Sequence, residues 1–162
     1  MAIWQFRLTL VPASEIQCRY ANMPNVIPPE DAEDFPWWNK TQPHANFEDQ
    51  IDKILPEIKS WSFGMRIWGD ERSNTATVCY NDDNNKIEWI GFRIDIRAIS
   101  EEYITAICAV AQDLECIFIT GTYHLLVPKV EAVLDAIGHS TAKKYIEDPV
   151  ATLRDLNGEK AE

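Results

Sequence analysis

Residues 75–97, TATVCYNDDNNKIEWIGFRIDIR, carry the strongest structural signal in this sequence. Two runs rich in β-branched and aromatic residues, 75–80 and 86–97, flank a cluster of five Asn and Asp residues that favours a turn. In the second run, Ile90, Phe92 and Ile94 occupy alternate positions, which is the period of a strand with one buried face. The segment therefore predicts a β-hairpin with one apolar face.

Alternating apolar residues predict further strands at 3–11 and 61–68, and a run of β-branched and aromatic residues predicts another at 116–127. Apolar residues at helical spacing predict helices at 47–58 and 101–115, and three more between Pro128 and Leu156. The predicted N-caps of these helices are Asn46, Ser100, Ser140 and Asp148. Five prolines and few periodic residues around 22–46 indicate a long irregular loop.

The order of these elements predicts the α+β class, because three consecutive strands favour an antiparallel sheet. We expect a single domain over residues 1–158, with a mainly antiparallel sheet of about five strands and helices packed on one face. Residues 159–162 are predicted to form a short polar C-terminal tail. A chain of 162 residues is long enough for one such core.

The composition narrows the functional classes. The formal charge of −11 opposes binding to long nucleic acids, because such binding depends on Lys and Arg contacts with phosphates. The chain shows no secretory signal and no run of about 20 apolar residues. We therefore expect a cytoplasmic protein with no membrane contact. The four cysteines lack metal-ligand spacing, so we expect no metal and no cofactor.

The first candidate site is the acidic and aromatic segment 28–38. It combines four carboxylates in five residues with two tryptophans: Glu30, Asp31, Glu33, Asp34, Trp37 and Trp38. Acidic residues steer a basic partner, and tryptophan is enriched among the residues that dominate binding energy. These six residues are our predicted partner-binding set. The alternative is a solvated acidic loop whose tryptophans fold back over the core.

The second candidate site is a set of arginines on the predicted sheet: Arg7, Arg66, Arg93 and Arg97. Arg93, Asp95 and Arg97 occupy alternate positions of one strand, and Arg7 and Arg66 lie on polar faces of other strands. Forked guanidinium groups on such a face can hold a small anion. The alternative is a solvated face on which Arg and Asp pair across strands.

Catalysis has weaker support. The motifs of serine hydrolases, P-loop enzymes, dinucleotide-binding domains and zinc proteases are absent from the sequence. Combinations of His124, Asp95 and Cys79 lack an activating local motif. A glycoside-directed enzyme stays open because tryptophans can stack on sugars and carboxylates are plentiful. Trp4 and Trp61 are predicted to be core residues, which leaves Trp37, Trp38, Trp68 and Trp89 as possible exposed rings.

Several short patterns carry a resemblance to small acidic bacterial proteins, among them immunity proteins of polymorphic toxin systems. These patterns are the Pro36-Trp37-Trp38 loop, the segment from Ser60 to Gly69, the Arg93–Arg97 strand and the Asp148-Pro149 helix start. The resemblance implies a stoichiometric binder that blocks a basic toxin, and it implies no catalytic residue.

The leading hypothesis is thus a non-enzymatic protein-binding domain, most specifically an immunity-type inhibitor that acts by occlusion. The first alternative is a small-molecule or anion-binding domain that uses the arginine-lined sheet face. The second is an enzyme of unrecognised type, with glycosides as the suggested substrates.

Overall fold

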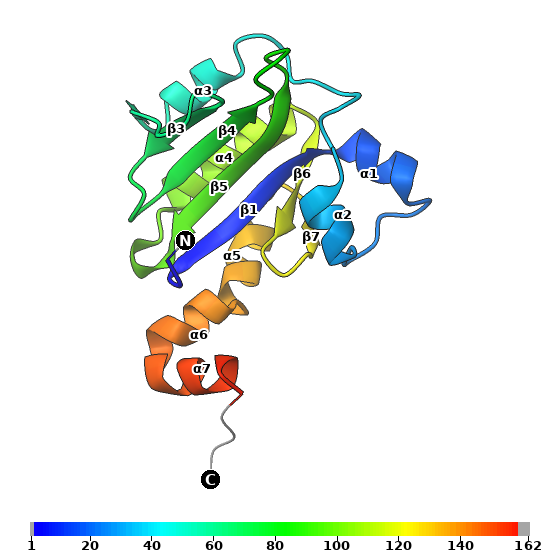
Figure 1. Ribbon diagram of the computed structural model, residues 1–162. Coiled ribbons are helices and arrows are strands. Elements are labelled where there is room, and N and C mark those ends of the chain that lie inside the picture. The colour runs from blue at the N-terminus through cyan, green and yellow to red at the C-terminus, as the bar shows by residue number, and fades with distance from the viewer. Residues whose placement is uncertain (1, 159–162) are drawn as a thin grey trace.

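The computed structural model describes residues 2–158, and its core is an antiparallel sheet with the strand order β2-β3-β4-β5-β1-β6-β7 (Figure 1). The strands are β1 (Gln5–Pro12), β2 (Glu57–Ile58), β3 (Met65–Gly69), β4 (Thr75–Tyr80), β5 (Ile87–Asp95), β6 (Cys116–Thr120) and β7 (Leu125–Leu126). The α+β class is confirmed. The described residues form seven strands rather than about five, and the predicted tail at 159–162 lies outside them.

The first strand lies at the centre of the sheet, between β5 and β6. Its register places Leu8 opposite Phe92 and Leu10 opposite both Ile90 and Phe118. All five side chains are at most 1% exposed. Because residues directly opposite each other share a face, these side chains form one apolar face of the sheet.

Helices α4 (Glu101–Asp113) and α5 (Val130–Gly138) lie behind the sheet in Figure 1 and cover this apolar face. Ser100 caps α4 by accepting a hydrogen bond from the Tyr103 amide at 3.1 Å, as predicted. The buried Tyr103 hydroxyl donates to the Thr75 carbonyl at 2.8 Å and fixes the helix against β4. Helices α6 (Thr141–Glu147) and α7 (Pro149–Leu156) extend beyond the end of the sheet.

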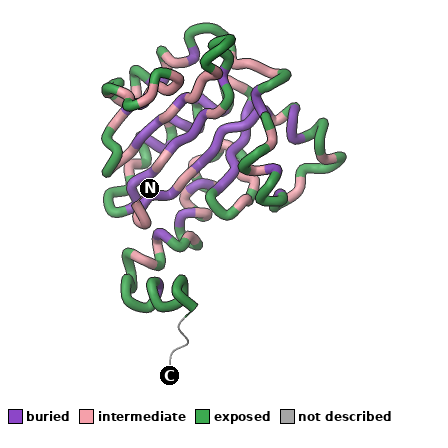
Figure 2. Tube along the Cα trace, in the orientation of Figure 1, coloured by how far each residue is buried: buried purple, intermediate pink, exposed green. Residues whose placement is uncertain are grey.

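The opposite face of the sheet is covered only in part. Helices α1 (Ala13–Arg19) and α2 (Pro29–Asp34) and the chain after them lie at the β6 side, with α2 in front of β6 and β7 in Figure 1. They bury Val11, Ile117 and Ile119 on this face. Over β5 and β4 the face stays accessible, with half-buried residues between buried ones (Figure 2). We call this the open face. The prediction that helices pack on one face of the sheet is therefore incomplete, because α1 and α2 cover part of the other face.

Several predicted boundaries are wrong, for local reasons. The predicted loop at 22–46 contains α2, which begins with Pro29 at its first position and carries two acids in its first turn. The predicted helix at 47–58 shortens to α3 (Glu48–Asp52). The predicted strand at 116–127 is a hairpin of β6 and β7, which turns at residues 121–124.

The largest error concerns the strand predicted at 61–68. Strand β3 begins only at Met65, so Trp61 and Phe63 lie in the loop before it. Trp61 is 79% exposed, and the prediction that it is a core residue is wrong. The short strand β2 pairs with Ile67 and Trp68 in the second half of β3.

The helices within residues 2–158 are all too short or too polar to span a membrane.

Candidate functional site

Asp31 of the predicted partner-binding set is a structural residue. It is 8% exposed and accepts hydrogen bonds from the Arg19 guanidinium, whose Nε lies 2.8 Å from Oδ2, and from the Tyr20 hydroxyl. The bonds from Arg19, and next those from Tyr20, hold the pKa of Asp31 below its usual range. This carboxylate anchors α2 to the end of α1 and is not available to a partner.

Trp37 and Trp38 also belong to the core. They are 4% and 2% exposed, and their indole Nε1 groups donate to the carbonyls of Asp31 and Leu10 at 3.0 and 3.1 Å. A partner can reach neither ring without displacing the whole segment. The hypothesis that a tryptophan of 28–38 fills a pocket in a partner is therefore corrected, and the alternative, in which they fold back over the core, describes both residues.

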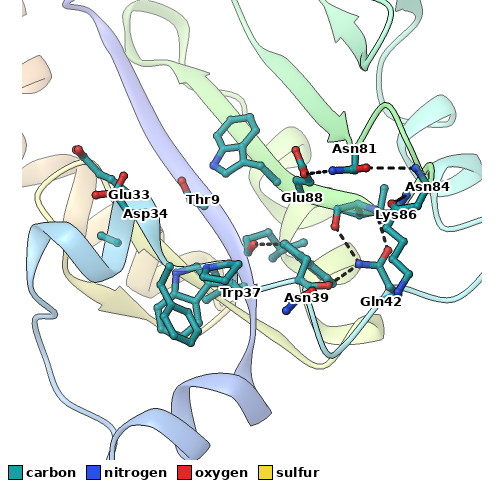
Figure 3. Close-up of a pocket in the computed structure, with 18 residues that line it drawn as sticks. Thr9, Glu33, Asp34, Trp37, Asn39, Gln42, Asn81, Asn84, Lys86 and Glu88 are labelled. Carbon is teal, nitrogen blue, oxygen red and sulfur yellow. Dashed lines mark hydrogen bonds between the residues drawn. The ribbon is translucent and has the colours of Figure 1, made fainter.

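The exposed acids of this segment are Glu30, Glu33 and Asp34. Glu33 and Asp34 lie at the rim of a cleft of about 300 Å³ on the open face. Figure 3 shows these two side chains on one side of the cleft, and Asn81, Asn84, Lys86 and Glu88 of the β4–β5 turn region on the other. Three exposed carboxylates therefore lie at the cleft rim, those of Glu33, Asp34 and Glu88, and Lys86 is the positively charged residue beside them.

Gln42 holds the two sides of this cleft together. Its Oε1 accepts from the Ile87 amide at 2.8 Å, and its Nε2 donates to the Ile87 carbonyl at 2.9 Å. The side-chain amide thus pairs with the start of β5 as a backbone group of a neighbouring strand would. This pairing ties the chain after Trp38 to the β4–β5 hairpin.

Trp89 supplies the cleft with a half-buried aromatic ring. Its indole lies against Gly91, two positions along β5, so that a Cβ on Gly91 would come within 2.1 Å of the ring. The missing side chain therefore allows the ring to lie flat on the open face. Thr9 and Thr77 occupy the strand positions on either side of Gly91.

The structure does not bring the four predicted anion-binding arginines together. Arg7 and Arg93 lie directly opposite each other on the open face. Arg66 lies opposite Val78 and so belongs to the helix-covered face, where Glu57 and Glu48 pair with it at 2.8 and 3.2 Å. Arg97 lies in a 3₁₀ turn (Ile96–Ala98) and is paired with Asp95. A four-arginine face does not exist, because strand parity and pairing separate the set.

The most exposed aromatic residues lie in a loop that the sequence reasoning placed in a strand. Phe63 is fully exposed and Trp61 is 79% exposed. Ser60 Oγ accepts from the Ser62 amide at 3.1 Å and donates to the Ser62 carbonyl at 2.9 Å, which gives the loop a defined turn. Serine at alternate positions, followed by Gly64, was the available signal for a turn here.

This loop contacts the β4–β5 turn. The Tyr80 amide donates to the Gly64 carbonyl at 2.8 Å, and a Cβ on Gly64 would come within 2.5 Å of an Asp82 carboxylate oxygen. Asp82 and Asp83 are both exposed. Gly64 therefore holds loop 60–64 against the turn at residues 81–86, and Asn81, Asn84 and Lys86 of that turn region also line the acidic cleft. We call Trp61, Phe63, Asp82, Asp83 and the cleft rim the acidic-aromatic surface.

The cysteine chemistry considered above has no support in the described residues. Burial raises the pKa of Cys108 to about 11 and of Cys116 to about 12, and it also raises the pKa of Cys79, so these thiols stay protonated at neutral pH. Cys18 is exposed. Within residues 2–158, no three His, Cys, Asp or Glu side chains are grouped as a metal site requires.

No protein-family model matches this chain, and neither a curated protein nor a solved structure is significantly similar to it.

Proposed function

We propose that this protein is a non-enzymatic binding domain that covers a basic protein partner with its acidic-aromatic surface. The observation that carries the proposal is the exposure of Trp61 and Phe63 at a hydrogen-bonded turn beside two exposed aspartates. The proposal retains the docking function expected from the sequence, but it assigns the aromatic contacts to loop 60–64 instead of segment 28–38.

Exposed aromatic rings in pairs are an unusual feature of a monomeric surface. Each such side chain offers about 150–250 Å² of contact area. Tryptophan in particular is enriched among the few residues that contribute most of the binding energy at interfaces. Because the hydrogen bonds between Ser60 and Ser62 fix the backbone turn, a partner that covers the rings orders only their side chains and not the loop backbone. The loop therefore suits an anchor that inserts into an apolar depression of the partner.

The surrounding charges favour a basic partner. Asp82, Asp83 and Glu88 lie on one side and Glu33 and Asp34 on the other side of the same surface, in a chain with a net charge of −11. Such a field speeds encounter with a basic protein and repels a second copy of this chain. A lysine or arginine of the partner that enters the cleft would meet the Trp89 ring and the carboxylate rim.

The more specific form of this proposal is an immunity-type inhibitor of a basic toxin, and it rests on the resemblance of the short sequence patterns. It places the protein in the cytoplasm of a bacterium, where it would occlude the toxin without catalysis. The same acidic field disfavours long nucleic acids as partners.

The proposal is tested with the product of the neighbouring gene as the candidate partner, by calorimetric titration. We expect W61A/F63A to weaken the affinity at least 100-fold, and D82N/D83N to weaken it and to reduce its dependence on salt. The matched control is L153A/L156A, which removes two exposed apolar side chains from α7. A complex whose affinity is unchanged in W61A/F63A, or equally weakened in L153A/L156A, would sink the proposal.

A further inference from the structure

A second hollow of about 650 Å³ lies at the N-terminal end of β1, away from the acidic-aromatic surface. The start of β1, the β6–β7 hairpin and the junction of α5 and α6 enclose it. In Figure 1 these elements lie at the end of the sheet opposite the β4–β5 turn. The volume lies within the range of pockets that take small organic molecules. We call it the Arg7 cavity.

Arg7 is half-buried and lines this cavity, and one nitrogen of its guanidinium lacks a hydrogen-bond partner. Its Nε is buried and, among the described residues, is the one buried side-chain nitrogen or oxygen with no hydrogen-bond partner. No carboxylate of residues 2–158 forms an ion pair with Arg7. An unsatisfied buried donor is costly in a native protein, so a hydrogen-bond acceptor that reaches Arg7 Nε would be stabilised there.

Arg93 adds to this local positive charge. It lies directly opposite Arg7 on the neighbouring strand, and no described carboxylate pairs with it either. Like charges at directly opposite strand positions are destabilising. The pair thus keeps two uncompensated cations side by side on the open face of an otherwise acidic protein.

The rest of the cavity wall is made of apolar and hydrogen-bonding side chains with a single carboxylate. Ile3, Phe6, Leu126 and Ala136 supply apolar surface, and Asp135 is the one carboxylate in the lining. His124 Nδ1 lies 3.1 Å from both the hydroxyl and the carbonyl oxygen of Thr122. This arrangement leaves Nε2 of the ring without a hydrogen bond within the described residues.

We propose that the Arg7 cavity binds a small organic oxyanion, with an apolar body in the cavity and a carboxylate or phosphate monoester on Arg7. A guanidinium binds such groups side-on through Nε and one terminal nitrogen, so a small rotation of Arg7 satisfies the orphaned Nε–H. Arg93 strengthens the attraction, and His124 is placed to bond the same ligand. This site is independent of the proposed partner surface.

The experiment uses phenyl phosphate and sodium benzoate as probes on the purified full chain, with benzyl alcohol as the uncharged control. Thermal melting and calorimetric titration measure binding. We expect at least one anionic probe to bind saturably and to raise Tm, because a ligand that binds only the native state stabilises it. Benzyl alcohol should neither bind nor raise Tm. The better of the two anions identifies the head group.

Two variants locate the binding. R7Q should lower the affinity at least tenfold, whereas R154Q, which changes an exposed arginine of α7, should leave it unchanged. A136L fills the cavity without removing a charge and should abolish binding, so it keeps the test valid if R7Q fails to fold. Absence of binding by both anions, equal binding of benzyl alcohol, or binding that survives either R7Q or A136L would overturn the proposal.

Discussion

The sequence pattern predicts Trp38 on a binding surface and Trp61 in the core, whereas the structure buries Trp38 and exposes Trp61. The reversal predicts very different losses of stability when each residue is replaced. We compare Trp38→Ala with Trp61→Ala. Trp38 is 2% exposed and its Nε1 donates to the Leu10 carbonyl at 3.1 Å, whereas Trp61 is 79% exposed. The first substitution should strongly destabilise the fold, and the second should hardly affect it.

The magnitudes follow from the area that each ring buries. A buried aromatic side chain removes about 150–250 Å² from water, which at about 25 cal/mol per Å² is worth about 4–6 kcal/mol. Trp38→Ala should therefore lower the free energy of unfolding by about 3–5 kcal/mol, the usual range for such substitutions. Trp61 has about a fifth of that area covered, so Trp61→Ala should cost about 1 kcal/mol.

The assay is urea unfolding followed by far-ultraviolet circular dichroism, because tryptophan fluorescence changes with the substitution itself. Trp38→Phe is the matched control: it keeps most of the apolar area but leaves the Leu10 carbonyl without its donor, at a cost of about 1–3 kcal/mol. A Trp61→Ala variant that loses more than about 2 kcal/mol, or a Trp38→Ala variant that loses less, would refute the placement of both residues.

Three further predictions address the network at α2, the thiols and the open face. Asp31→Asn should lower stability at neutral pH and flatten its decline in acid: the neighbouring Arg19 lowers the folded-state pKa of Asp31, so its contribution is present above about pH 4 and is lost as the pH falls further. Urea midpoints between pH 7 and pH 3 measure this, and an unchanged pH slope would count against it. Iodoacetamide at pH 8 should alkylate the exposed Cys18 of the native protein first and Cys116 only in denaturant, as read by mass spectrometry of peptides; early labelling of Cys116 would contradict its burial. Gly91→Ala should destabilise by about 1–3 kcal/mol because its Cβ would meet the indole that lies on it, and the cost should vanish in a Trp89→Ala background.

The elements that the sequence predicted well are those with a strong local signal. The hairpin of β4 and β5 and the helix α4 with its Ser100 cap are all present, because a turn cluster, a two-residue period and a capping side chain are properties of neighbouring residues. The caps at Ser140 and Asp148 are present for the same reason. The two-residue strands β2 and β7 carry no such period, and they form only because a longer strand lies beside them.

Site residues were harder to predict than elements. In segment 28–38, Glu33 and Asp34 reach the cleft rim, but the two tryptophans pack inward. Alternation along 61–68 suggested a strand because Trp61, Phe63, Met65 and Ile67 follow its period. A period places residues on the same side of a strand, but it cannot show whether another element covers that side.

Composition and short-range periodicity were enough to predict an α+β chain with a mainly antiparallel sheet, the hairpin at 75–97 and a net negative charge, because neighbouring residues record these properties directly. Only the tertiary structure decided that the first strand pairs between β5 and β6, which places Arg7 opposite Arg93 and leaves one face of the sheet partly open. Pairing between residues more than 80 positions apart depends on how whole apolar faces fit together. That fit is a property of the assembled core and leaves no period in the chain.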